Sequence, residues 1–254
     1  EHLVMPALQS APASSQEHGE CPMSTITLTQ VEPAFASPML LFQVQDCEAL
    51  NRQLIEEGQA MRARSPGVTR SNREGWHSED DFFGRTEPGC TALRTHILEA
   101  VQESTRLLSP DFDFAANRAL CQGWINVNPP GAFNAPHDHS GFALSGVYYA
   151  SVPPEGRSGA IEFLDPRVNA NAYTIEGAAC FNRKFIINPK PGNLLVFPSY
   201  LTHWVQPNGD STDRITVAFN IRYLKQSDPV PGLAQQNRAK PASSAAPLAR
   251  VSIV

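Results

Sequence analysis

The chain has 254 residues, of which 41% are hydrophobic and 18% are charged. This length allows a sizeable buried core, and all-β barrels of this size often form one domain. The formal net charge of −5 excludes the basic field that attracts nucleic acid or an anionic membrane surface. The sequence also lacks an apolar run of about 18 residues, the length needed to span a bilayer.

Both ends of the chain have the composition of flexible tails. Residues 1–24 mix Ala, Ser, Pro, Gln and Glu without periodicity, and residues 226–254 are rich in Pro, Ala and Ser. Such segments bury too little apolar surface to fold alone. We therefore predict one domain over residues 25–225, between an N-terminal tail (1–24) and a C-terminal tail (226–254).

Two amphipathic helices are predicted early in this domain, within residues 46–110. Asp46 is a candidate N-cap for the first, which we expect to end near Arg62. The second is indicated by apolar residues spaced three and four apart from Leu93 to Leu108, and Pro110 lies just beyond it.

From about Ala119 onward the sequence predicts strands separated by Gly and Pro. The expected strands are Cys121–Asn128, Gly141–Val152, Gly159–Leu164, Ala172–Ile175, Lys184–Ile187, Asn193–Phe197, Thr202–Gln206 and Arg214–Leu224. This series favours a mainly β fold, a β-sandwich or jelly-roll barrel over residues 119–225, with the helices supporting one sheet.

Three histidines form the strongest candidate for a metal site. Nearby prolines disfavour a helix at His137, and residues i and i+2 of an extended chain point to the same side. His137 and His139 then converge while Asp138 points away, and His203 on a later strand can supply a third imidazole. Three neutral ligands on one face leave open positions, as in non-haem Fe(II) oxygenases. The alternative for each histidine is a hydrogen-bonded core residue.

The last predicted strand alternates between a polar and an apolar face. Its polar face carries Arg214, Thr216, Ala218 and Asn220. A guanidinium inside a barrel is costly unless it is paired, and a bound carboxylate would pair with it through charge-assisted hydrogen bonds. Thr216 and, from the expected strand Gly141–Val152, Tyr149 can add hydroxyl donors. The alternative for Arg214 is a salt bridge with the nearby Asp210 or Asp213.

These motifs together resemble the Fe(II)/2-oxoglutarate-dependent dioxygenase superfamily. The likeness is strongest to the bacterial and phage group of 2OG-Fe(II) oxygenases of prolyl-hydroxylase type. The segments that carry it, in the order of the family, are Gly123–Asn128, Pro136–His139, Ser145–Tyr149, Gly159–Phe163, Pro191–Pro198, His203 and Arg214–Thr216, with Gly75–Ser78 as a weaker extension.

The resemblance implies a double-stranded β-helix, Fe(II), 2-oxoglutarate as co-substrate and O2. It implies that His137 and His203 are iron ligands. It also implies that Arg214, Thr216 and Tyr149 hold the distal carboxylate of 2-oxoglutarate, with Asn126 as a further polar contact.

The sequence departs from the family at His139. The usual motif is His-x-Asp or His-x-Glu, and here a third histidine takes the place of the carboxylate. We favour a face of three histidines, which would leave the metal its full +2 charge until the dianionic co-substrate binds. The alternatives are that Asp138 turns in through a bulge, or that His139 contacts the substrate or supports a ligand from behind.

The expected reaction is hydroxylation of an unactivated C–H bond of a small molecule or an amino-acid side chain, with release of succinate and CO2. Desaturation or ring formation is compatible with the same site. The alternatives are a three-histidine cupin-type dioxygenase without 2-oxoglutarate and a non-catalytic metal-binding β-barrel. The pair Arg214 and Thr216 argues against the first, and the polar face inside the barrel argues against the second.

Candidate substrate contacts are expected in loops at the barrel mouth. They are Trp76, His77, Arg167 and Trp204, and a structural role is the alternative for each. For Arg167 that alternative is a local salt bridge with Asp165.

The five scattered cysteines form no C-x-x-C pair and no disulfide framework, which is typical of reduced thiols in a cytoplasm. The first residues lack the basic flank and apolar segment of a signal peptide. We therefore expect a cytoplasmic enzyme that binds a small-molecule or amino-acid-type substrate, with no nucleic-acid and no membrane partner. A homodimer is compatible with the sequence.

Overall fold

The computed structural model describes residues 26–30, 34–152, 158–168 and 174–229. The chain divides into two compact units, residues 1–36 and 37–254. The described part of the first unit holds a turn but no helix or strand. The predicted tails fall almost entirely outside the described residues, so the expected domain bounds stay a prediction.

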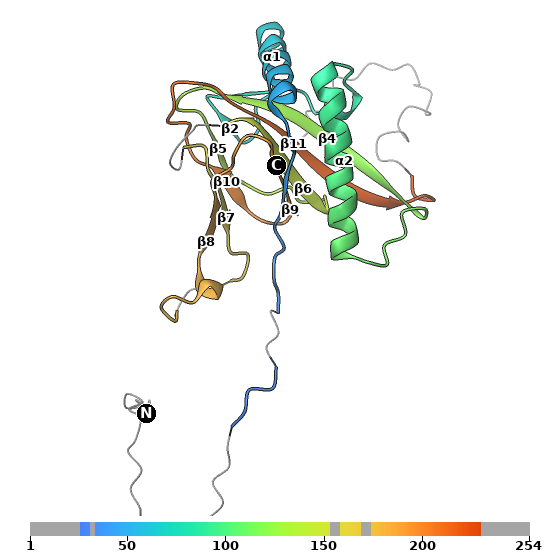
Figure 1. Ribbon diagram of the computed structural model, residues 1–254, viewed down its shortest axis with the longest axis vertical. Helices are drawn as coiled ribbons and strands as arrows, with labels where there is room; N and C mark the ends of the chain where they lie inside the picture. Colours follow the sequence, from blue (N-terminus) through green and yellow to red (C-terminus); the bar gives the residue numbers. More distant parts are fainter. Residues whose placement is uncertain (1–25, 31–33, 153–157, 169–173, 230–254) are drawn as a thin grey trace, which may run out of the picture. The chain divides into compact units, whose positions relative to one another are not determined.

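The second unit is built around two antiparallel sheets (Figure 1). The larger sheet has six strands in the order β1-β9-β6-β11-β4-β3. Its strands are β1 (Leu40–Gln43), β3 (Trp76–His77), β4 (Asn117–Asn128), β6 (Leu144–Ser151), β9 (Asn193–Pro198) and β11 (Arg214–Lys225). The smaller sheet has five strands in the order β2-β5-β10-β7-β8. They are β2 (Asn72–Arg73), β5 (Phe133–His137), β7 (Ile161–Leu164), β8 (Lys184–Ile187) and β10 (His203–Val205).

Helices α1 (Glu48–Arg64) and α2 (Pro88–Leu108) lie against the larger sheet, α1 on β4 and β6 and α2 on β9. Their buried side chains, such as Leu54 and Ile97, join one apolar cluster with Val217 and Phe219 of β11. The packing is close: a Cβ at Gly58 of α1 would lie 3.3 Å from the side chain of Ile125 of β4. The predicted buttress of helices behind one sheet is therefore present.

A second apolar cluster lies between the sheets. It contains Val147, Tyr149, Ile161, Phe163, Leu195, Phe197, Leu201 and Val205. Side chains of successive strand residues point to opposite faces, so β6 and β9 contribute to both clusters. Within the described ranges, no helix is long and apolar enough to cross a membrane.

Several predicted boundaries need correction. Cys47, not Asp46, precedes α1, and Asp46 has a positive φ of 47° in the turn before it. Leu107 and Leu108 end α2 but are exposed, because the helix runs past the edge of the core. The sequence missed β1, β2, β3 and β5, which are short and take their partners from distant segments. The strand predicted at Ala172–Ile175 is wrong for the two residues that are described, Thr174 and Ile175.

Two short 3-10 helices complete the described elements, Phe82–Gly84 and Ala179–Phe181. The first places Phe82 in the core beside Gly123 of β4. This contact anchors the segment that follows β3.

Candidate active site

A pocket of about 430 Å³ opens between the two sheets. Its walls come from β4, β6 and β11 on one side, from β5, β7 and β10 on the other, and from the segment around β2 and β3. Most of the residues predicted for a site line it: His137, His139, His203, Asn126, Tyr149, Arg214, Thr216 and His77.

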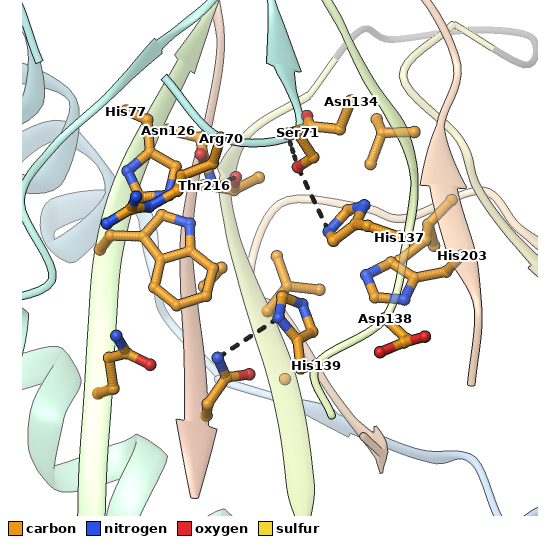
Figure 2. A pocket seen from close by; sticks show the side chains of 18 of the residues that line it. Arg70, Ser71, His77, Asn126, Asn134, His137, Asp138, His139, His203 and Thr216 are labelled. Carbon is orange, nitrogen blue, oxygen red and sulfur yellow. Dashed lines mark hydrogen bonds between the residues drawn. The ribbon is translucent and has the colours of Figure 1, made fainter. Parts of the chain in front are cut away.

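Three of these residues form a compact imidazole cluster (Figure 2). One ring nitrogen from each of His137, His139 and His203 lies within 4.8 Å of the others, a spacing suited to one metal ion. The cluster forms because β5 and β10 pair with His137 opposite His203. His139 follows two residues after His137, beyond the end of β5.

Hydrogen bonds from the backbone orient two of the rings. Nδ1 of His137 lies 2.7 Å from the carbonyl oxygen of Ala135, and Nδ1 of His203 lies 2.9 Å from that of Leu201. A carbonyl oxygen only accepts, so each Nδ1 carries the proton and donates it. Nε2 of each ring is then the unprotonated nitrogen that a metal can bind, the arrangement that second-sphere acceptors enforce at many metal sites. Nε2 of His137 lies 3.4 Å from the hydroxyl of Ser71, which a metal would replace as its partner.

The surroundings also keep these imidazoles neutral. Burial, and then the neighbouring His137, lower the pKa of His139 to about 4 and the pKa of His203 to about 3. Burial lowers the pKa of His137 as well. Because only an unprotonated nitrogen binds a metal, all three are ready as ligands at neutral pH.

Asp138 is engaged elsewhere. Its carboxylate accepts hydrogen bonds from the backbone and the hydroxyl of Ser140, at 3.0 and 2.6 Å. These bonds lower the pKa of Asp138. It lies at the pocket rim and is not part of the three-residue cluster. The extended geometry expected from the sequence accounts for this: residues i and i+2 converge and the residue between them turns away.

Arg214 lies in the larger sheet with 2% of its surface exposed. Its Nε and the hydroxyl of Tyr149 are buried without a hydrogen-bond partner in the described part of the chain, as is Oδ1 of Asn126. The guanidinium carbon lies 5.4 Å from the centre of the Tyr149 ring. Burial lowers the pKa of Arg214 and raises that of Tyr149 to about 12.

The two aspartates considered as partners of Arg214 are occupied. Asp213 pairs with Arg62 at 3.2 Å, and Asp210 accepts hydrogen bonds from Ser211 and Thr212. No described carboxylate forms an ion pair with Arg214 within 4.0 Å. A buried cation with an unfilled donor fits an anionic ligand, because desolvation of an unpaired charge is costly.

Of the four predicted substrate contacts, His77 alone lines the pocket. Trp76 is buried in the core and donates to the carbonyl oxygen of Ser65. Trp204 donates to Glu162 at 2.8 Å, and Arg167 pairs with Asp165 at 2.7 Å. Trp76, Arg167 and Trp204 therefore do not line this pocket, because each side chain is held by a structural partner, and their role as substrate contacts stays a prediction.

Residues that the sequence did not single out complete the wall near His77. Trp124 stacks on His77, with ring centres 5.0 Å apart, and its ring centre is 5.8 Å from that of His139. Asp80 accepts from Gln122 at 2.7 Å and lies 3.7 Å from Arg70. The alternation of β4 could have indicated Gln122, Trp124 and Asn126 as one face. Arg70 and Asp80 carried no such signal.

Comparison with known proteins agrees with this geometry. Residues 122–220 match the model of a family described as "Putative 2OG-Fe(II) oxygenase". The matched segment runs from Gln122 to Asn220 and includes all three histidines, Tyr149, Arg214 and Thr216. No curated protein matches the chain by sequence.

Solved structures of similar fold are distant in sequence. A prolyl-4-hydroxylase from Pseudomonas putida has a TM-score of 0.52 and 16% identity, over 72% of this chain and 91% of that one. The 2-oxoglutarate-dependent epimerase SnoN of nogalamycin biosynthesis has a TM-score of 0.54 and 15% identity, over 85% and 90%. The carbocyclase SnoK of the same biosynthesis has a TM-score of 0.54 and 12% identity, over 79% and 86%.

The expected fold is thus confirmed: the two facing sheets form a double-stranded β-helix with helices behind the larger sheet. The oxygenase is an Fe(II)/2-oxoglutarate-dependent enzyme, and its cofactors are Fe(II), 2-oxoglutarate and O2. The pocket fits both groups. It offers three neutral nitrogens for a metal and a buried, unpaired guanidinium with nearby unfilled polar atoms for a carboxylate.

Proposed function

We propose that the enzyme hydroxylates a C–H bond of a small molecule or an amino-acid side chain, with His137, His139 and His203 as the iron ligands. The observation that carries this is one pocket lined both by the imidazole cluster and by Arg214 with its unpaired Nε. Bound together, iron and 2-oxoglutarate supply the oxidation, in which O2 gives one atom to succinate and one to the substrate while CO2 leaves.

The residues of the chain have separate tasks in this proposal. Arg214 binds the distal carboxylate of 2-oxoglutarate, and Thr216 and Tyr149 donate their hydroxyls to it. Because these donors are buried and fixed in the sheet, they orient the co-substrate with little loss of side-chain freedom. Asn126 is 3.5 Å from the hydroxyl of Thr216 and extends the same polar wall.

Metal binding by His139 in place of a carboxylate is the part of the proposal with the sharpest test. His139→Ala should weaken Mn(II) binding by at least about 100-fold, because a ligand is lost. Asp138→Ala should leave the affinity within about twofold, because its carboxylate bonds to Ser140 and not to the cluster. Calorimetry of Mn(II) binding measures both. The reverse order of the two variants would assign the metal to Asp138.

The wall near His77 is proposed as the substrate side. Arg70, Asp80 and Gln122 offer charged and amide groups, while Trp124 and His77 offer flat apolar faces. This mixture suits a small polar substrate better than a purely apolar one. Succinate release that depends on 2-oxoglutarate, screened over polar small molecules and amino acids, tests the assignment. His77→Ala should raise KM for an accepted substrate and leave Mn(II) affinity unchanged.

Hydroxylation is one of several outcomes that this fold supports, since similar structures include an epimerase and a carbocyclase. The product mass decides between them. A gain of one oxygen atom supports the proposal, whereas a product of unchanged mass or one that has lost two hydrogens would replace it.

A further inference from the structure

The third histidine is supported differently from the other two. Asn220 of β11 places its amide nitrogen 3.4 Å from Nδ1 of His139, the contact drawn as a dashed line in Figure 2. Oδ1 of the same amide accepts from the hydroxyl of Ser145 at 2.7 Å, and Ser145 lies 2.8 Å from the hydroxyl of Ser199. The backbone N–H of His139 donates to the carbonyl oxygen of Ser199 at 3.0 Å.

This chain of side chains is almost closed to solvent. Asn220, Ser145 and Ser199 are 3%, 1% and 1% exposed. Buried polar groups are costly unless they are hydrogen-bonded, so the orientation of each of these three side chains constrains that of the next. β11 pairs with β6 so that Asn220 faces Ser145, and β6 pairs with β9, which ends just before Ser199.

The difference from His137 and His203 lies in the chemistry of the partner. A backbone carbonyl only accepts, so it fixes the proton on Nδ1 of those two rings. A carboxamide both donates and accepts, and a half-turn about its last bond exchanges the oxygen and the nitrogen without a change of shape. Serine hydroxyls reverse direction equally well. No backbone carbonyl bonds to the His139 ring anywhere in the described ranges.

With the amide nitrogen toward it, Nδ1 of His139 is an acceptor, so the proton of the neutral ring is on Nε2. That tautomer does not offer Nε2 to a metal. Metal binding through Nε2 requires the proton on Nδ1, and therefore an acceptor beside it. The amide oxygen of Asn220 becomes that acceptor after a half-turn, while its nitrogen then donates to Ser145.

We propose that Asn220, Ser145 and Ser199 form a reversible hydrogen-bond relay that sets the tautomer of His139. When a metal occupies the three histidines, the amide oxygen of Asn220 faces Nδ1 of His139 and accepts a hydrogen bond from it. Asn220 is thus a positioning residue for the third ligand. This inference rests on the proposed three-histidine metal site, and it does not depend on 2-oxoglutarate or on the substrate.

The experiment is a titration of the full-length protein with Mn(II), and with Co(II) followed by its visible absorption, both without 2-oxoglutarate. Asn220→Leu removes the acceptor and should weaken metal binding about 10- to 100-fold and shift the Co(II) bands. Asn220→Asp supplies a permanent acceptor. This variant should bind the metal at least as tightly as the natural protein and show the same Co(II) spectrum. Ser145→Ala breaks the second link and should cost a smaller, few-fold loss.

The matched control is Asn51→Leu. Asn51 is also a buried asparagine, on α1, and it accepts a hydrogen bond from Tyr148 at 2.7 Å away from the pocket. Asn51→Leu should lower the melting temperature and leave metal affinity unchanged. If Asn220→Leu does not fold, the other two variants test the relay, because Asn220→Asp should keep metal affinity whereas Ser145→Ala should lower it.

Two results would overturn the relay. In the first, Asn220→Leu binds the metal as tightly as the natural protein does. In the second, Asn220→Asp and Asn220→Leu lose the same amount of metal affinity. Failure of the proposed function gives a different pattern. The variants would then show the predicted metal affinities, but the protein would release no succinate that depends on 2-oxoglutarate.

Discussion

The two faces of β11 are equally buried and chemically opposite. Ile215, Val217 and Phe219 on one face are at most 1% exposed and pack in the apolar cluster with the helices. Arg214 and Thr216 on the other face are 2% and 1% exposed, yet they line the pocket and Arg214 keeps an unfilled donor. Burial alone therefore does not distinguish core from site. Incomplete pairing of buried polar groups does, because a protein core normally satisfies them.

The comparison predicts that substitutions on the two faces separate stability from binding. Phe219→Ala should lower the free energy of unfolding by about 3–5 kcal/mol, because it leaves a cavity beneath Gly146 and between the sheet and the helices. Urea denaturation measures this. Metal affinity of the folded fraction should not change, and Phe185→Ala, at a site 55% exposed, should change stability by less than about 0.5 kcal/mol. Equal losses for both phenylalanines would contradict the assignment of the core.

Arg214→Leu should have the opposite profile. Loss of charge-assisted hydrogen bonds should weaken 2-oxoglutarate binding to the Mn(II)-loaded protein by at least about 100-fold. Stability should stay equal or rise, because a buried unpaired cation is removed. Calorimetry and thermal unfolding of the same preparation give both values. Unchanged co-substrate affinity would remove the basis for the proposed function.

The histidine cluster should make the stability of the metal-free protein depend on pH. The pKa values of His139, about 4, and His203, about 3, lie below the value of about 6.5 for an unfolded histidine. Between pH 6.5 and 4 the unfolded chain therefore binds more protons, so stability falls as the pH falls. The slope should reach at most about 1.4 kcal/mol per pH unit for each histidine.

Urea unfolding in a chelator at pH 7, 6 and 5 measures this slope. His96→Gln is the control, because His96 lies on α2 with its side chain 43% exposed and should leave the slope unchanged. A flat profile would show that the buried imidazoles do not resist protonation.

The smallest effect is expected outside the pocket. Arg167 bonds to Asp165 with its side chain 42% exposed, and solvent screens such an ion pair. Arg167→Ala should leave the melting temperature and KM for any accepted substrate unchanged. A raised KM would return Arg167 to the substrate site and would weaken the contrast between pocket and surface.

Local pattern was sufficient for the elements whose side chains alternate over a long run. The polar and apolar faces of Arg214–Ile221 were predicted from period two alone, and the H-x-H spacing placed His137 and His139 on one side of an extended chain. Both follow from backbone geometry within a few residues. Boundaries were less certain where a helix leaves the core, as Leu107 and Leu108 show.

The wall near the substrate side was not predictable in this way. Asp80 and Arg70 belong to short connections around β3, and they reach the pocket because β3 pairs with β4 and β2 with β5. Such pairings join segments far apart in sequence, and each involves only two residues of the shorter strand. The adjacent residues Trp76 and His77 show the consequence: Trp76 enters the core, whereas His77 lines the pocket.

The sequence by itself therefore supplied the candidate ligand groups, three imidazoles and a guanidinium, and the alternation that directs them away from solvent. Only the tertiary structure decided that β10 sets His203 opposite His137, that Arg214 has no carboxylate partner among the described residues, and that Asn220 stands behind His139. The physical reason is that strand register over long distances is fixed by the packing of the whole core, whereas the direction of a side chain is fixed by its own strand.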